Sequence, residues 1–176
     1  DVSRIILAGD LDFLPPLHRI VRIPILKPGG GIVSQAGYDS ETRTYFAPGF
    51  LLVPGIPENP TKEEIRSALD LLQTELLGDF PFVDEADRAN ALALILLPFV
   101  REVIEGPTPL HLFEKPSPGS GASLLLEALG LIIRGAPPAL MTEGSDEDEW
   151  RKRITSTLVT GPELVCIDNL KRRLDS

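Results

Sequence analysis

The chain has 176 residues, 43% of them hydrophobic, which is enough for one sizeable core or a core with a small appendage. Its formal net charge of −9, from 17 basic and 26 acidic residues, makes it a poor nucleic-acid binder by bulk electrostatics alone. One cysteine and two histidines exclude a disulfide framework and an all-Cys/His zinc site, and no apolar run approaches the ~20 residues of a membrane span. We therefore expect a cytoplasmic chain without a membrane partner. Because it begins with Asp1, we interpret it as an excerpt from a longer protein.

Residues 1–60 are punctuated by proline and glycine, with short β-rich runs at 20–23 and 43–46. Gly37-Tyr38-Asp39 is expected to open a turn before the second run. This composition predicts an irregular β-hairpin lead-in that contains no helix and no functional site.

A helical accessory unit is predicted for residues 61–106. Thr61 and Glu64 have the spacing of a capping box, so a first helix should begin there. A second helix should begin at the acidic residues 84–87 and kink at Pro98. Each helix carries an apolar stripe, which we expect to pack against the rest of the chain because a buried Leu or Ile contributes ~1.5–3 kcal/mol. The stripes consist of Ile65, Leu69 and Leu72, and of Leu92, Leu96 and Val100.

From residue 107 to residue 176, strand and helix patterns alternate. Apolar strands are predicted at 110–113, 139–142 and 164–167, with helices at about 122–133 and 145–158 between them. This order implies an α/β layer with a parallel sheet.

The segment Pro-Ser-Pro-Gly-Ser-Gly-Ala-Ser at residues 116–123 lies between the first strand and its helix, where a phosphate-binding loop belongs. Glycines allow successive N–H groups to turn inward, and together with the helix N-terminus these groups cradle phosphate. Compared with G-x-x-x-x-G-K-[ST], Pro116 replaces the first glycine and Ala122 replaces the lysine. A plain turn between strand and helix is the competing interpretation. The candidate nucleotide-binding residues are Pro118, Gly119, Ser120, Gly121, Ala122, Ser123 and Leu124.

A candidate magnesium site completes the loop. The apolar run 164–167 ends in Asp168, as a Walker B strand does, and Ser123 occupies the position of the metal-binding hydroxyl. Ser123 and Asp168 are therefore the predicted Mg²⁺ ligands. Asn169 stands where many P-loop ATPases have a glutamate, and it is the candidate water-orienting residue.

These motifs together resemble the helicase-like ATPases of phage, plasmid and integrated-element replication proteins, which often carry a primase-polymerase domain upstream. Besides the loop, the likeness is carried by 107–110, 148–154 and 167–169, and 37–39 and 59–61 resemble the region before the ATPase. The resemblance implies a partial P-loop NTPase core, ATP and Mg²⁺ as ligands, self-association as a ring in the full-length protein, and DNA contact only through that assembly. A sensor residue and an arginine finger would lie beyond Ser176, so the core would be truncated after Walker B.

The expected organisation is a β-rich lead-in (1–60), a helical unit (61–106) and a partial P-loop core (107–176). The predicted function is nucleotide binding within a DNA-replication helicase-like ATPase of a mobile element. Ala122 gives the phosphates no cation, so we do not expect this chain to hydrolyse nucleotide. The alternative is a degenerate P-loop module with a structural or assembly role and no turnover.

Six further features receive structural interpretations. The basic runs at 151–153 and 171–173 are interpreted as solvated helix faces, and Lys115 as a surface lysine. His111 is expected to be a hydrogen-bonded core or rim histidine, Cys166 a small buried apolar residue, and Trp150 a packing anchor.

Overall fold

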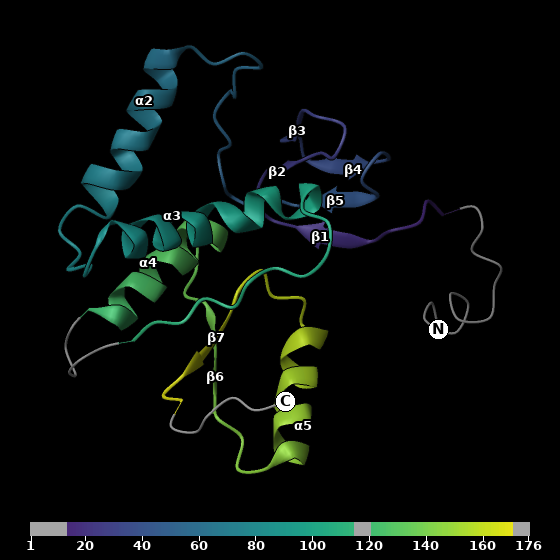
Figure 1. Ribbon diagram of the computed structural model, residues 1–176. Helices are drawn as coiled ribbons and strands as arrows, with labels where there is room; N and C mark the ends of the chain where they lie inside the picture. Colours follow the sequence, from purple (N-terminus) through teal and green to yellow (C-terminus); the bar gives the residue numbers. More distant parts are fainter. Residues whose placement is uncertain (1–13, 115–120, 171–176) are drawn as a thin grey trace.

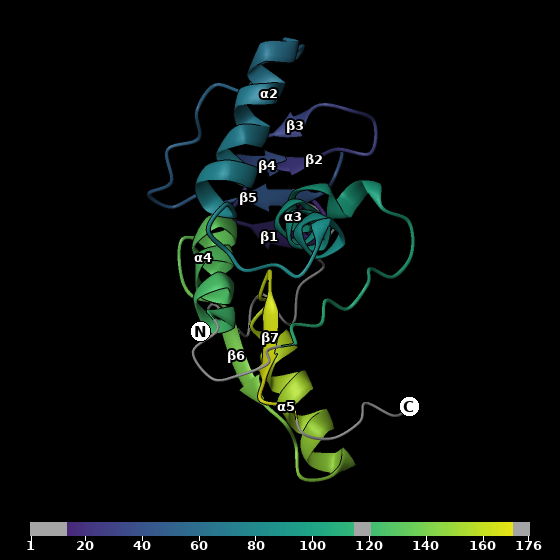
Figure 2. The same ribbon diagram turned by 60° about the vertical axis from the view of Figure 1, so that its left-hand side comes forward.

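The structure, a computed structural model, describes residues 14–114 and 121–170 (Figure 1). These residues form a mixed α/β structure with several helices and three small sheets, one of which is a parallel pair. The helices α2 (Lys62–Asp70) and α5 (Glu147–Val159) lie at opposite ends of the described part of the molecule. The helices α3 (Glu85–Val100) and α4 (Ala122–Arg134) lie between them (Figures 1 and 2). No helix within the described ranges is both long and apolar enough to cross a bilayer.

Within residues 14–60, the regular elements are short strands only, as the composition predicts. The strands are β1 (Arg19–Val21), β2 (Ile25–Leu26), β3 (Ile32–Val33), β4 (Gly37–Asp39) and β5 (Thr44–Phe46). β5 pairs in parallel with β1 and antiparallel with β4, and β2 pairs antiparallel with β3. Val21, Ile25, Val33 and Phe46 form a small core of their own.

The expectation for Gly37-Tyr38-Asp39 is wrong in one respect, because these residues form β4 itself and the turn follows them. The Asp39 side chain closes that turn by accepting hydrogen bonds from the Thr42 amide and hydroxyl, both at 2.9 Å. Lys27 forms an ion pair with the same carboxylate. These contacts lower the pKa of Asp39 to about 2, first through Lys27 and then through the Thr42 amide.

Residues 61–103 are mainly helical, and the predicted capping box is present. The Glu64 amide donates to Thr61 Oγ1 at 3.2 Å, and the Thr61 amide donates to Glu64 Oε2 at 2.7 Å. The Asp84 carboxylate caps α3 in the same way, because the Asp87 amide donates to it at 3.0 Å. The elements are α2 (Lys62–Asp70), a π-helix η1 (Leu71–Leu76), α3 (Glu85–Val100) and a 3₁₀ turn η2 (Arg101–Val103).

The expected burial of the α2 stripe is wrong. Ile65 and Leu69 are 47% and 40% exposed, and α2 has no buried residue. Both residues lie in α2, which extends away from the central core (Figure 1). Leu72, the second residue of η1, packs against that core.

The predicted α3 stripe is also displaced. Its buried residues are Ala91, Leu94 and Ile95, while Leu96 is 42% exposed. Residues 91–100 are apolar on nearly every side, so periodicity does not single out one face.

The central core joins three parts of the chain. Ile23 follows β1, Leu77 follows η1, and the remaining residues come from α3 and α4. An ion pair of 2.8 Å between Arg19 and Glu102 also connects β1 to η2. The cluster comprises Ile23, Leu77, Ala91, Leu94, Ile95, Leu125, Leu129 and Ile133.

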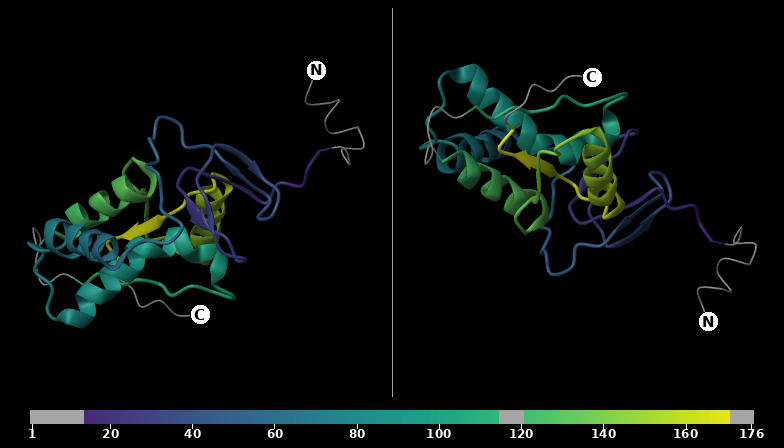
Figure 3. Two further views of the ribbon diagram at one scale, coloured as in Figure 1. Left: turned by 90° about the horizontal axis from the view of Figure 1, so that it is seen from above. Right: turned by 90° about the horizontal axis from the view of Figure 1, so that it is seen from below.

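The C-terminal part consists of α4 (Ala122–Arg134), β6 (Ala139–Thr142), α5 (Glu147–Val159) and β7 (Val165–Asp168). β6 and β7 are parallel, as predicted, and α5 is the crossover helix between them. The strand pair lies between α4 and α5 (Figures 1 and 3). At the end of α4, Gly130 is needed because a Cβ there would lie 2.5 Å from Pro138 Cδ.

The predicted strand at 110–113 is wrong. Residues 107–114 have no regular secondary structure, and β6–β7 is a two-stranded sheet within the described ranges. Leu110 and Leu112 are 72% and 68% exposed, and only Phe113 packs against the central core. Prolines at 107 and 109 remove two backbone donors just before the run, which disfavours a ladder there.

Candidate functional site

The described site residues form two groups in the sequence, one at the start of α4 and one at the end of β7. Gly121, Ala122, Ser123 and Leu124 open α4, and Asp168 with Asn169 ends β7. Three predicted residues lie outside the described ranges, as do Lys115 and the basic run 171–173. Those three are Pro118, Gly119 and Ser120.

Among the residues that the structure describes, no side chain caps the N-terminus of α4. Gly121 is the N-cap in the left-handed conformation, with φ of 86°, and its carbonyl accepts the first helical hydrogen bond from the Leu125 amide at 2.9 Å. The amides of residues 122–124 therefore have no acceptor within the helix, and they point out of its positive end. Such a terminus favours an anion. Ala122 adds no positive charge to it.

Gly121 is required by its backbone conformation, because the left-handed φ disfavours any side chain. Space is not the reason, since a Cβ at Gly121 would lie 3.4 Å from Phe80 Cε2, an ordinary van der Waals contact.

The predicted metal ligand Asp168 lies at the carboxyl ends of β6 and β7. Asp168 is exposed and is the ladder partner of Thr142, the last residue of β6. Asn169 follows with φ of 59°, a left-handed conformation that asparagine tolerates better than most residues, and so ends the strand. Within the described ranges, the side chains of Asp168 and Asn169 have no hydrogen-bond or ion-pair partner. They are therefore open to a ligand.

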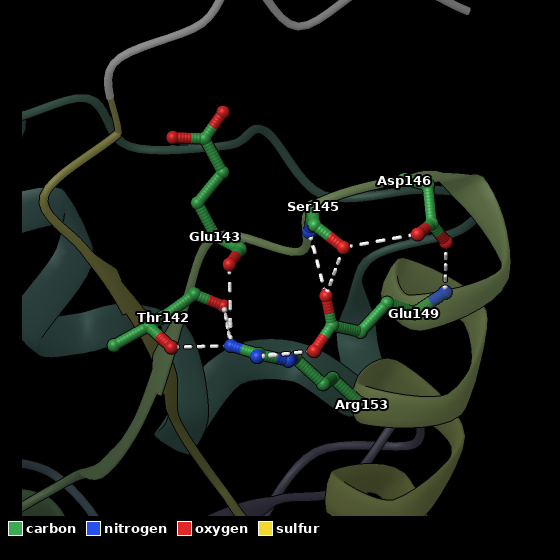
Figure 4. A network of polar contacts seen from close by, with 6 residues as sticks. All are labelled: Thr142, Glu143, Ser145, Asp146, Glu149 and Arg153. Carbon is green, nitrogen blue, oxygen red and sulfur yellow. Dashed lines mark hydrogen bonds and ion pairs between the residues drawn. The ribbon is translucent and has the colours of Figure 1, made fainter.

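A polar network fixes the end of β6 (Figure 4). Arg153 Nη1 donates to the carbonyl oxygens of Thr142 and Glu143, at 3.1 and 3.2 Å, and to the Thr142 hydroxyl. Its Nη2 donates to Glu149 at 2.6 Å. The amide and hydroxyl of Ser145 donate to the other oxygen of the same carboxylate, at 2.8 and 2.5 Å. These Ser145 bonds, followed by that from Arg153, lower the pKa of Glu149 to about 2.

Sequence reasoning missed the contribution of Thr142 and assigned Arg153 to a solvated face. The four-residue spacing of Glu149 and Arg153 indicates an ion pair on one helix face. This spacing does not predict the contact between Arg153 and Thr142, because the two residues are eleven positions apart and meet only through the packing of α5 against β6.

The predicted Mg²⁺ ligands, Ser123 and Asp168, carry oxygen donors of the kind that Mg²⁺ takes in proteins. Mg²⁺ is usually held by one or two carboxylates with phosphate oxygens and waters. The described part of the chain contains no group of three or more His, Cys, Asp or Glu that could hold a metal. An ion at Asp168 would therefore need oxygens from a ligand to complete its coordination.

A shallow groove of about 270 Å³ lies elsewhere, between η1 and α3. Gln73, Arg88, Leu92 and Leu96 are among its lining residues, and none of the predicted site residues borders it. Arg88 is already used there, because it donates to the Gln73 carbonyl at 3.1 Å and stacks over Phe82. The groove is therefore not part of the nucleotide site.

The remaining predicted residues have different outcomes. Cys166 is buried as expected, and burial followed by the charge of Asp168 raises the pKa of its thiol. Trp150 packs closely against Gly144, as an anchor does. His111 is half-buried, as a rim histidine is, but its buried Nε2 has no hydrogen-bond partner within residues 14–114 and 121–170, so the expected hydrogen bond is not found at that atom.

No model of a known protein family matches the chain, and no curated protein or solved structure matches it either. The nucleotide-site hypothesis therefore depends on the chain's own residues.

Proposed function

We propose that this chain is a Mg²⁺-nucleotide-binding fragment of a DNA-replication helicase-like ATPase from a mobile element. The observation that carries the proposal is the uncapped N-terminus of α4 at Gly121, in a chain that also places Asp168 at the carboxyl end of a parallel strand. Ligands of open α/β sheets bind outside the carboxyl ends of the strands. Ring assembly and contact with DNA belong to the full-length protein in this proposal.

Each residue has one task in the proposed complex. The amides of residues 122–124 donate to phosphate oxygens, and the dipole of α4 favours their negative charge. The Ser123 hydroxyl and the Asp168 carboxylate hold Mg²⁺, directly or through its waters. Asn169 orients water in the complete assembly. When bound, Mg²⁺ offsets negative charge on the phosphates.

Ala122 limits what the site does. A hydrogen bond to a charged group is worth ~1.5–3 kcal/mol, so a missing lysine weakens binding by roughly 10- to 150-fold. Hydrolysis loses more, because the same cation would stabilise charge that develops in the transition state. The chain by itself therefore binds Mg²⁺-nucleotide weakly and does not turn it over.

A second candidate function is a degenerate P-loop module that serves structure or assembly and binds no nucleotide. One observation favours it: residues 110–113 form no strand, and Leu110 and Leu112 are exposed. A phosphate loop that follows an unpaired segment is less firmly positioned than one that follows a central strand.

Calorimetry with ATP and Mg²⁺ separates the two functions. The chain as it stands is compared with Ala122→Lys and with Ala122→Gln, which adds similar length without charge. We expect Ala122→Lys to bind roughly 10- to 150-fold more tightly, and Ala122→Gln to leave affinity unchanged. If none of the three chains gives a heat of binding while circular dichroism shows an intact fold, the loop is a plain turn. The second candidate function, a P-loop module that binds no nucleotide, is then correct.

A further inference from the structure

Thr142 and Asp168 are brought together by the register of the parallel sheet. They are ladder partners at the last position of β6 and β7. Neighbouring strands lie about 4.8 Å apart, and partners in a ladder project from the same face of the sheet. A hydroxyl and a carboxylate therefore stand side by side at the edge where the proposed Mg²⁺ site lies. Both residues are exposed.

The direction of the Thr142 hydroxyl proton follows from its partner. A guanidinium only donates hydrogen bonds, so the contact between Arg153 Nη1 and Thr142 Oγ1 uses the oxygen of Thr142 as the acceptor. The proton of Thr142 is then free to donate elsewhere. Arg153 is itself held by Glu149, and Glu149 by Ser145 (Figure 4). The hydroxyl is thus oriented before any ligand arrives.

We propose that Thr142 is a further nucleotide-binding residue, which donates its hydroxyl proton to a phosphate oxygen of the nucleotide whose Mg²⁺ is held by Asp168. Arg153 is a positioning residue that acts through Thr142. The inference rests on the proposed function and adds a contact from β6 to a site otherwise built from α4 and β7. It also places a hydrogen-bond donor near the phosphates in a chain that has Ala122 at the lysine position.

Arg153 also connects α5 to the end of β6, so its loss alone does not separate positioning from stability. The test therefore centres on Thr142, because Thr142→Val keeps the shape and the strand preference and removes only the hydroxyl. Thr142→Ser restores a hydroxyl at the same place. Arg153→Gln tests whether the Thr142 hydroxyl still contributes to nucleotide binding when the guanidinium that holds it is removed.

The readout is the ³¹P signal of ATP titrated with each chain, with Mg²⁺ and with excess chelator, while near-UV circular dichroism of Trp150 reports folding. We expect Thr142→Val to weaken Mg²⁺-ATP binding about 10-fold or more, as expected for a hydrogen bond to a charged group. Thr142→Ser should bind within about twofold of the unsubstituted chain, and Arg153→Gln should fall between the two.

The remaining outcomes distinguish the two proposals. If the unsubstituted chain binds Mg²⁺-ATP and Thr142→Val binds equally well, Thr142 does not touch the nucleotide and the proposed function stands without it. Equal losses in Thr142→Val and Thr142→Ser overturn the inference in the same way. If neither the unsubstituted chain nor Ala122→Lys perturbs the ³¹P signal, the proposed function fails and the inference fails with it.

Discussion

Replacing Leu129 with alanine tests the packing that holds α4, and with it the start of the helix at Gly121. Leu129 is fully buried in the central core. The substitution removes about three carbon groups, worth ~0.8 kcal/mol each, and leaves a cavity. Leu→Ala at such sites costs about 3–5 kcal/mol in total. Leu131, two positions later in the same helix, is 55% exposed, so Leu131→Ala should cost no more than about 0.5 kcal/mol.

Urea unfolding followed by far-UV circular dichroism measures both substitutions. With a slope of ~2 kcal/mol/M, the midpoint for Leu129→Ala should fall by roughly 1.5–2.5 M, and that for Leu131→Ala by about 0.3 M or less. Both substitutions change leucine to alanine in the same helix, so the difference in helix propensity between the two residue types is the same in both and cancels in the comparison. Equal losses at the two positions would refute the reasoning, because α4 would then not dock through the Leu129 face.

Two further predictions concern the site. Gly121→Ala should lower the free energy of unfolding by about 1–2 kcal/mol, because φ of 86° is left-handed, and Gly121→Asn should cost less. If the unsubstituted chain and Gly121→Ala had equal melting temperatures, the left-handed backbone conformation at Gly121 would be contradicted. Ser145 and then Arg153 lower the pKa of Glu149 from 4.5 to about 2, so its stabilisation should be complete above about pH 4.5 and be lost as pH falls toward 2. Trp150 fluorescence should report this acid unfolding transition. Glu149→Gln should remove the pH dependence that is due to Glu149 and leave the pH dependence that is due to Asp39. If Glu149→Gln left the acid transition unchanged, the network would not contribute to stability.

The helix boundaries were predictable because their causes are local. Thr61 and Glu64, Asp84 and Asp87, and the acids before α5 interact across three or four positions, and the sequence contains both partners of each bond. The parallel pair β6–β7 followed from two apolar runs separated by a helix. For the candidate site, the same logic correctly placed the start of α4 and the acid at the end of β7.

The failures concern long-range geometry. The apolar stripe of residues 65–72 predicted one buried face, but α2 extends away from the central core and only Leu72, in η1, packs against it. Whether residues 110–113 join a sheet depends on neighbours far along the chain. The contact of Thr142 with Arg153 depends in the same way on the packing of α5 on β6.

The two halves of the proposed site belong to parts of the molecule with different resistance to local opening. α4 contributes Leu125, Leu129 and Ile133 to the central core. By contrast, α5 has no buried residue, and the buried apolar residues of β6 and β7 are Met141 and Cys166, neither of which belongs to that core. Segments with little buried apolar surface open most often. A ligand that contacts both α4 and the end of β7 would suppress this local opening. Part of its favourable binding free energy would then be offset by the conformational entropy lost when β6, α5 and β7 become ordered.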